Sequence, residues 1–183
     1  MPKRNVKRMC YAALLAAMYL PLSLYAAVQV GNVRISFGSL PVVAAALLFG
    51  PVDAVIVAMV GEFFKQLLTY GITYTTVLYL IPPALRGLVV GLGALALLSL
   101  RGQRLEERRM LCYAVCIVAA VCTTLGNTLV NWLDSVLMGY YFPGLILGDF
   151  VWRLIVGMIN AVVMSSLAIP LVKTLRQRNV VSL

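Results

Sequence analysis

Long apolar stretches fill most of this chain, and the charged residues between them are gathered into a few short segments. Hydrophobic residues occupy 62% of the 183 positions and charged residues only 11%, whereas a soluble domain has about a quarter of its residues charged. A water-soluble fold of this size cannot bury so much apolar surface, so a closed helical bundle in a lipid bilayer is expected. The sequence has no long runs of alternating apolar and polar residues, which disfavours a transmembrane β-barrel.

The basic residues indicate which side of the membrane each connection faces. Most of the fifteen lysines and arginines lie in three short segments, residues 3–8, 101–109 and 173–178. By the positive-inside rule, all three segments are expected in the cytoplasm. The formal net charge of +9 would suggest nucleic acid in a soluble protein, but these clusters do not form a groove-sized patch, so no nucleic-acid partner is expected.

The number of crossings follows from these charges. Residues 40–70 are too many for one ordinary span, and Gly50-Pro51 near their middle predicts a turn. Only if this stretch crosses twice does the basic segment 101–109 fall on the cytoplasmic side. We therefore predict an all-α integral membrane protein with one domain, a six-transmembrane-helix bundle whose N- and C-termini are cytoplasmic. The predicted spans are residues 9–30, 40–50, 51–70, 75–98, 110–137 and 148–171.

Polar side chains inside predicted spans usually mark a site or a pathway, because they are costly in lipid. Glu62 and Lys65 are three residues apart in the third span and therefore share a helix face. Asn127, Asn131 and Asp134 form a continuous stripe on the fifth span. Tying neighbouring helices together is the structural alternative for such pairs and stripes.

The polar residues are concentrated in the outer half of the bundle. The sixth span adds a stripe with Asp149 and Arg153, and Arg86 lies near the middle of the fourth span. This asymmetry predicts a cavity that is open to the outside and closed toward the cytoplasm, whereas a channel would be polar throughout. Aromatic rings at the rim would suit a flat heterocyclic ligand, although such rings also serve as interfacial anchors. They are Tyr70, Tyr74, Tyr79, Trp132, Tyr140, Tyr141 and Trp152.

Enzymatic chemistry is not expected. The sequence has no histidine, so a Ser-His-Asp or Cys-His arrangement is excluded, and it has no phosphate-binding loop of the Walker type. The four cysteines fit neither a disulfide framework nor a zinc site, and no metal or cofactor is predicted. Energy for transport would have to come from partner chains or an ion gradient.

The segments Arg34–Pro41 and Leu48–Pro51, the motif Ala12-x-x-x-Ala16 and the segment Asn127–Trp132 form a recognisable set. In these segments the chain resembles the S components of energy-coupling factor (ECF) transporters, the substrate-binding membrane subunits of these importers. Arg34–Pro41 and Leu48–Pro51 are similar to the segments around the second span in the folate-specific branch. The motif Ala12-x-x-x-Ala16 resembles the first-helix motif that docks on the transmembrane coupling subunit, and Asn127–Trp132 resembles the polar segment of the fifth span. Residues 70–87 depart from the folate pattern, and Pro82-Pro83 within them predicts a kink in the fourth span.

The resemblance implies an S component that captures a vitamin or vitamin precursor, with folate-like as the preferred class, from outside the cell. It also implies a coupling subunit and two ATPases as partners in a bacterial cytoplasmic membrane. Ala12 and Ala16 are the implied docking residues, with ordinary packing inside the chain as the alternative. The candidate ligand contacts are Arg34, Ser36, Lys65, Tyr70, Tyr74, Arg86, Asn127, Asn131, Trp132, Asp149 and Arg153.

The sequence leaves open the sign of the ligand's charge and the functional class of the protein. Four cations in the outer half face three anions, which mildly favours an anionic ligand without excluding a cationic one. A six-span membrane scaffold of the cell-shape type would need polar residues only for partner binding, so loss of Arg153 or Asn131 would leave no ligand phenotype. A stand-alone secondary transporter would need a polar path to the inside, which the sequence does not show.

Overall fold

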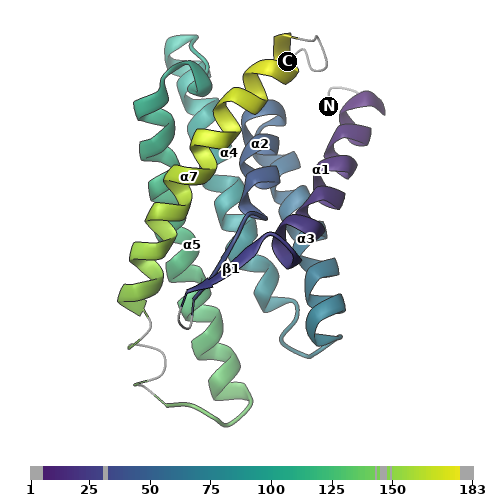
Figure 1. The fold of residues 1–183 in the computed structure, drawn as a ribbon, viewed down its shortest axis with the longest axis vertical. Coiled ribbons are helices and arrows are strands. Elements are labelled where there is room, and N and C mark those ends of the chain that lie inside the picture. Colours follow the sequence, from purple (N-terminus) through teal and green to yellow (C-terminus); the bar gives the residue numbers. More distant parts are fainter. Residues whose placement is uncertain (1–5, 31–32, 143, 145–147, 149, 178–183) are drawn as a thin grey trace.

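The computed structural model describes residues 6–30, 33–142, 144, 148 and 150–177. Within them, six α-helices make up the bundle. Helix α1 starts and helix α7 ends at the same end of the molecule, which we call the termini end (Figure 1). The opposite end carries a β-hairpin, and we call it the hairpin end. The helices are α1 (Val6–Leu24), α2 (Ser39–Phe49), α3 (Pro51–Tyr70), α4 (Ile81–Arg101), α5 (Arg109–Leu137) and α7 (Phe150–Gln177).

Helix α2 forms the centre of the bundle. Ten of its 11 residues are buried, and it packs against α1, α3, α4 and α7. A helix that is apolar on every side is expected in such a position. At about 1.5 Å per residue its length is about 16 Å, roughly half of a bilayer core that is about 30 Å thick. Gly50, with φ +89°, reverses the chain, and Pro51 then occupies the first turn of α3.

Helices α3 and α4 approach closely because α4 presents glycines to its neighbour. A Cβ atom on Gly91 would lie 2.4 Å from the Cα atom of Pro51, and one on Gly87 would lie 2.9 Å from the backbone of Ala54. Small residues at such contacts let two backbones approach each other. This packing fixes the position of α4, which carries Arg86.

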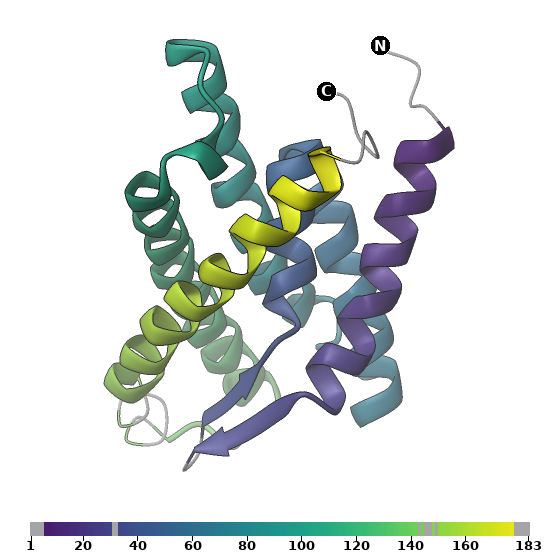
Figure 2. The same cartoon turned by 45° about the horizontal axis from the view of Figure 1, so that its top comes forward.

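The helical architecture agrees with the prediction, but two segments differ from it. Helix α1 ends at Leu24 rather than at residue 30, and an antiparallel hairpin follows, in which β1 (Ala27–Val30) pairs with β2 (Val33–Ser36). Alternating β-branched residues favour this hairpin, which takes the place of the predicted end of the first span and the connection after it. Figure 2 shows it crossing from the end of α1 toward the first turns of α7, which β2 contacts.

The second difference concerns Pro82 and Pro83. They do not kink the fourth helix; they lie in its first turn, because α4 begins at Ile81 after the 3₁₀ turn η1 (Leu78–Leu80). Proline is favoured in a first turn, where its missing N–H would have no partner within the helix. The helix therefore starts later than the predicted residue 75.

Three helical segments within the described part of the chain are long and apolar enough, by length and composition alone, to cross a membrane. These are Leu78–Arg101, Arg109–Leu137 and Phe150–Gln177, and α2 is a shorter apolar helix. Helix α1 carries Lys7 and Arg8 in its first turn, and α3 carries Asp53, Glu62 and Lys65. Six crossings therefore remain a prediction.

Two arginines close the termini end of the bundle around the end of α2. Arg8 donates to the Phe49 carbonyl and pairs with Asp53, while Arg176 donates to the Leu47 carbonyl at 2.6 Å. Arg176 also forms an ion pair with Glu106, at 3.0 Å between Nε and Oε1. The last carbonyls of a helix have no partners within it, and here α1 and α7 supply them. We call Arg8, Asp53, Glu106 and Arg176 the arginine clasp.

Candidate ligand-binding cavity

A cavity of about 670 Å³ lies between α3, α4 and α5 in the half of the bundle nearer the hairpin. This volume falls within the range of about 300–1,000 Å³ that is usual for small-molecule sites. The exposed side chains of Tyr70 and Met138 stand at its mouth. Its wall is formed by Tyr19, Ser36, Ser39, Val42, Glu62, Lys65, Gln66, Tyr70, Thr73, Thr75, Tyr79, Pro82, Pro83, Arg86, Thr123, Asn127, Asn131, Asp134 and Met138.

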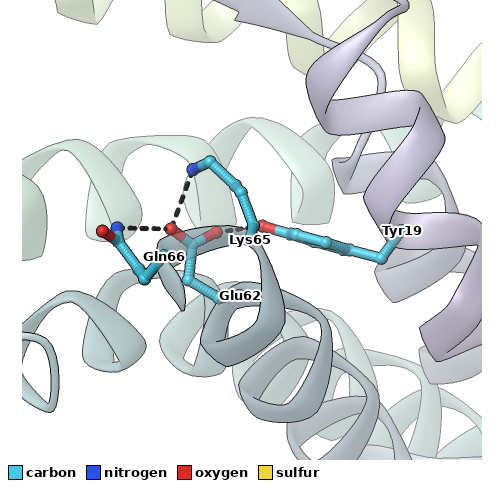
Figure 3. Close-up of polar contacts among 4 residues, drawn as sticks. All are labelled: Tyr19, Glu62, Lys65 and Gln66. Carbon is cyan, nitrogen blue, oxygen red and sulfur yellow. Dashed lines mark hydrogen bonds and ion pairs between the residues drawn. The ribbon is translucent and has the colours of Figure 1, made fainter. Parts of the chain in front are cut away.

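The Glu62 carboxylate is held by three donors (Figure 3). The Tyr19 hydroxyl donates to Oε2 at 2.5 Å from α1, and Lys65 Nζ and Gln66 Nε2 donate to Oε1 at 2.8 and 2.9 Å. Gly61 makes room for the tyrosine, because a Cβ atom there would lie 2.5 Å from the Tyr19 ring. Since Lys65 neutralises Glu62, this part of the wall offers polar atoms but little net charge.

A second carboxylate is held near the mouth by two tyrosines. The Tyr79 hydroxyl donates to Asp134 Oδ2 at 3.1 Å, and Tyr140, which follows α5, donates to the same oxygen. The hydrogen bond to Asp134 raises the pKa of the Tyr140 phenol above its ordinary value, because the charged acceptor favours the protonated phenol. Asp134 therefore ties η1 and the chain after Leu137 to the end of α5.

The loop between α3 and η1 is fixed by its threonines. The Thr73 N–H donates to Thr76 Oγ1 at 2.9 Å, and the Thr76 N–H donates to the Thr73 carbonyl at 3.1 Å. Side chains of this type form local turns by bonding to nearby backbone. The loop presents Thr73 and Thr75 to the cavity.

Arg86 lies where the cavity continues into a second, much smaller pocket of about 10 Å³. A volume of about 10–15 Å³ is enough for roughly one water molecule. Ser39 and Arg86 line both spaces, and Asn160 and Cys116 line the small one. Two atoms here are buried without a hydrogen-bond partner among the described residues, Ser39 Oγ and Asn160 Oδ1. The two spaces thus meet at polar side chains, and each space has at least one hydrogen-bonding atom beside it that lacks a partner among the described residues.

The structure brings six of the predicted contacts together in the cavity wall: Ser36, Lys65, Tyr70, Arg86, Asn127 and Asn131. Three others do not line it. Tyr74 is 99% exposed at the tip of its loop, and Trp132 is 42% exposed because it lies about 100° around α5 from Asn131. Arg153, on α7, lies outside the wall as well. Asp149 and the side chain of Arg34 are outside the described residues.

Sequence reasoning left several wall residues out of the predicted set. Glu62, Asp134 and Tyr79 were recognised as polar or aromatic positions in the outer half but were not chosen as contacts. Tyr19 was missed altogether. The available signal was a tyrosine in an apolar helix, since a buried hydroxyl group usually has a partner.

The two predicted docking residues both pack within the chain, Ala16 buried and Ala12 partly buried. Ala16 is 8% exposed and belongs to the core, and Ala12 packs against that core. The alternative, ordinary packing within the chain, describes them better. The exposed alanines on α1 are Ala13 and Ala17, one position further along in each case.

The helical fold and the one-sided cavity define a membrane protein with a built site for a small molecule. The chain belongs to the family of S components of ECF-type riboflavin transporters, whose model matches residues 3–177. It is thus a multi-pass membrane protein and a substrate-binding subunit, not an enzyme. The resemblance to ECF S components found in the sequence is confirmed.

Two solved structures share the fold. One, described as the S component of a bacterial ECF transporter, has a TM-score of 0.65 at 20% identity, with 95% of this chain and 98% of that chain covered. The other is FolT bound with folic acid, with a TM-score of 0.57 at 20% identity and 95% of each chain covered. No curated protein matches the chain.

Proposed function

We propose that this S component captures a vitamin or vitamin precursor from outside the cell and passes it to an ATP-driven module. That module would consist of a transmembrane coupling subunit and two ATPases. The observation that carries the proposal is the cavity of about 670 Å³, with its polar wall confined to one half of the bundle. A folate-like compound is our preferred ligand, and a flavin is the second candidate because the family model is that of riboflavin transporters.

We infer that the chain crosses the membrane six times with the termini end in the cytoplasm. The support is the position of the basic residues, since Arg8, Arg104, Arg109 and Arg176 all lie at the end opposite the cavity mouth. The positive-inside rule then directs the cavity outward.

We propose that the coupling subunit packs on the exposed face of α1 that contains Ala13 and Ala17. Leu14 and Met18 are exposed beside them, at 55% and 43%. Small residues at this spacing allow a second helix to approach closely. This assignment replaces Ala12 and Ala16, which are occupied by contacts within the chain.

Ligand identification on the purified protein tests the capture function. The protein is denatured, and the released small molecules are identified by mass spectrometry. Thermal-shift titrations with B vitamins and their precursors follow, because a ligand that binds only the folded state raises stability by RT ln(1 + [L]/Kd). A retained or stabilising vitamin supports capture, whereas a folded protein that responds to none of them favours the membrane scaffold. Uptake that survives loss of every ECF ATPase would instead favour a stand-alone carrier.

A further inference from the structure

The charged groups in the cavity wall differ in how well they are satisfied. Glu62 and Lys65 form an ion pair with each other, and two tyrosines donate to Asp134. Arg86 forms no hydrogen bond or ion pair within the part of the chain that the structure describes. Glu62 attracts it at longer range, but both carboxylate oxygens of Glu62 already accept from other donors.

The position of Arg86 makes this difference relevant to binding. Its side chain lines both the main cavity and the small pocket, so it lies where the two spaces meet and borders the space open to a ligand. Ser39, which is 6% exposed, adds a hydroxyl without a partner at the same place. A charge at this depth is unfavourable unless an opposite charge or strong hydrogen bonds compensate for it.

We propose that Arg86 binds an acidic group, a carboxylate, at the buried end of the ligand, with the Ser39 hydroxyl beside it. The planar guanidinium matches a carboxylate with two parallel hydrogen bonds, which a neutral carbonyl group cannot accept in the same way. The proposal rests on the capture function above and narrows its ligand to vitamins that carry a carboxylate. Lys65 is a poorer anchor, because its charge is already paired with Glu62 and an ammonium group lacks the planar pair of donors that a guanidinium offers.

The test compares ligands and variants on the purified, folded protein. A panel of carboxylate vitamins (folic acid, pantothenate, nicotinate and biotin) and neutral or cationic ones (riboflavin, pyridoxine and thiamine) is titrated onto the wild-type chain. We expect the tightest ligand to carry a carboxylate. Arg86→Gln should weaken that ligand at least about 10-fold, in line with a lost charge-assisted hydrogen bond. The control Arg109→Gln removes an exposed arginine at the termini end and should leave affinity unchanged.

A change to the ligand tests the proposal on the wild-type protein, without relying on the Arg86→Gln variant. The methyl ester or amide of the tightest ligand should bind the wild-type protein at least about 10-fold more weakly than the acid, since it no longer carries the charge that Arg86 would pair with. A neutral tightest ligand overturns the proposal but leaves the capture function intact, as does an ester that binds as well as its acid. A folded wild-type protein that binds no member of the panel overturns both.

Discussion

The two ends of the bundle use charged side chains in opposite ways. At the termini end, Arg8 and Arg176 are paired with carboxylates and donate to backbone carbonyls of α2. Their charges are therefore neutralised by contacts within the fold. In the half nearer the hairpin, Arg86 faces open space, and Asn127 and Asn131 line the same cavity. The first arrangement holds helices together, whereas the second leaves hydrogen-bonding capacity for a ligand.

Helix α2 is apolar between the cavity and the termini end. Below Ser39, α2 continues as an unbroken run of buried residues from Val42 to Phe49, and Val90 of α4 packs against it. A conducting path would need polar groups along its whole length. The described residues therefore form a blind cavity, sealed by an apolar core and the arginine clasp. A cargo bound in it has no open path to the other side in this conformation.

Breaking the clasp should give the largest loss of stability. In Arg176→Ala, Glu106, whose side chain is 4% exposed, keeps a buried charge without its partner, and the Leu47 carbonyl loses its donor. Removing one member of a buried pair costs about 3 kcal/mol. Thermal unfolding in detergent measures this loss, and ligand affinity of the folded fraction should not change.

A double variant separates the charge from the packing. Arg176→Met combined with Glu106→Leu removes both charges and should recover part of the stability, because no buried charge is then left unpaired. A single variant as stable as the wild type would show that the clasp does not hold the termini end.

Removal of the Tyr19 hydroxyl should lower stability less than breaking the arginine clasp. Tyr19→Phe removes one of the three donors to the buried Glu62 carboxylate and should cost about 1–3 kcal/mol in unfolding free energy. Tyr113→Phe is the matched control, because its hydroxyl contacts Ser166 at an exposed site. Equal losses in the two variants would mean that the Glu62 cluster is not a stabilising part of the cavity wall.

Asn131 and Trp132 are adjacent in sequence, but only Asn131 lines the cavity. Asn131→Ala should weaken ligand binding about 10-fold through the loss of hydrogen bonds, whereas Trp132→Ala should change affinity less than about 2-fold. Equilibrium titration of both variants checks this. A larger effect from Trp132 would place the ligand outside the cavity.

Substitutions on the proposed docking face of α1 should affect the isolated protein least. Replacing Ala13 and Ala17 with leucine adds bulk to exposed positions, so stability and ligand binding should be retained while uptake into cells is lost. Replacing Ala12 and Ala16 with leucine should instead destabilise the fold, because these residues pack in the core. Uptake that persists in the first variant would remove α1 from the docking surface.

Much of this organisation could be predicted from the sequence, since apolar length and basic clusters report on membrane helices directly. The turn at Gly50-Pro51 was predicted in this way. Lys65, Arg86, Asn127 and Asn131 were predicted as ligand contacts because they are polar side chains within apolar spans, and they line the cavity. Span six illustrates a limit, because a polar stripe shows which residues share a face but not which neighbour that face meets. Arg153 therefore belonged to the predicted set although it does not line the cavity.

Long-range contacts explain the remaining differences. The Tyr19–Glu62 bond joins residues 43 positions apart, and the Arg176–Leu47 bond joins residues 129 positions apart. No local pattern specifies such pairs. The register of α1 was also open, since Ala12-x-x-x-Ala16 and Ala13-x-x-x-Ala17 have the same spacing, and only packing shows which pair faces the core.

Cysteine labelling in intact cells tests most directly whether an outward-facing cavity captures the ligand. In a chain whose Cys10 is replaced by serine, Met138→Cys places a thiol at the cavity mouth and Glu107→Cys places one in the connection between α4 and α5. A membrane-impermeant maleimide applied outside should label only the first, and the ligand identified by mass spectrometry should slow that labelling. Labelling at position 107 from outside, or an unchanged rate at position 138 with saturating ligand, would contradict the model of outward-facing capture.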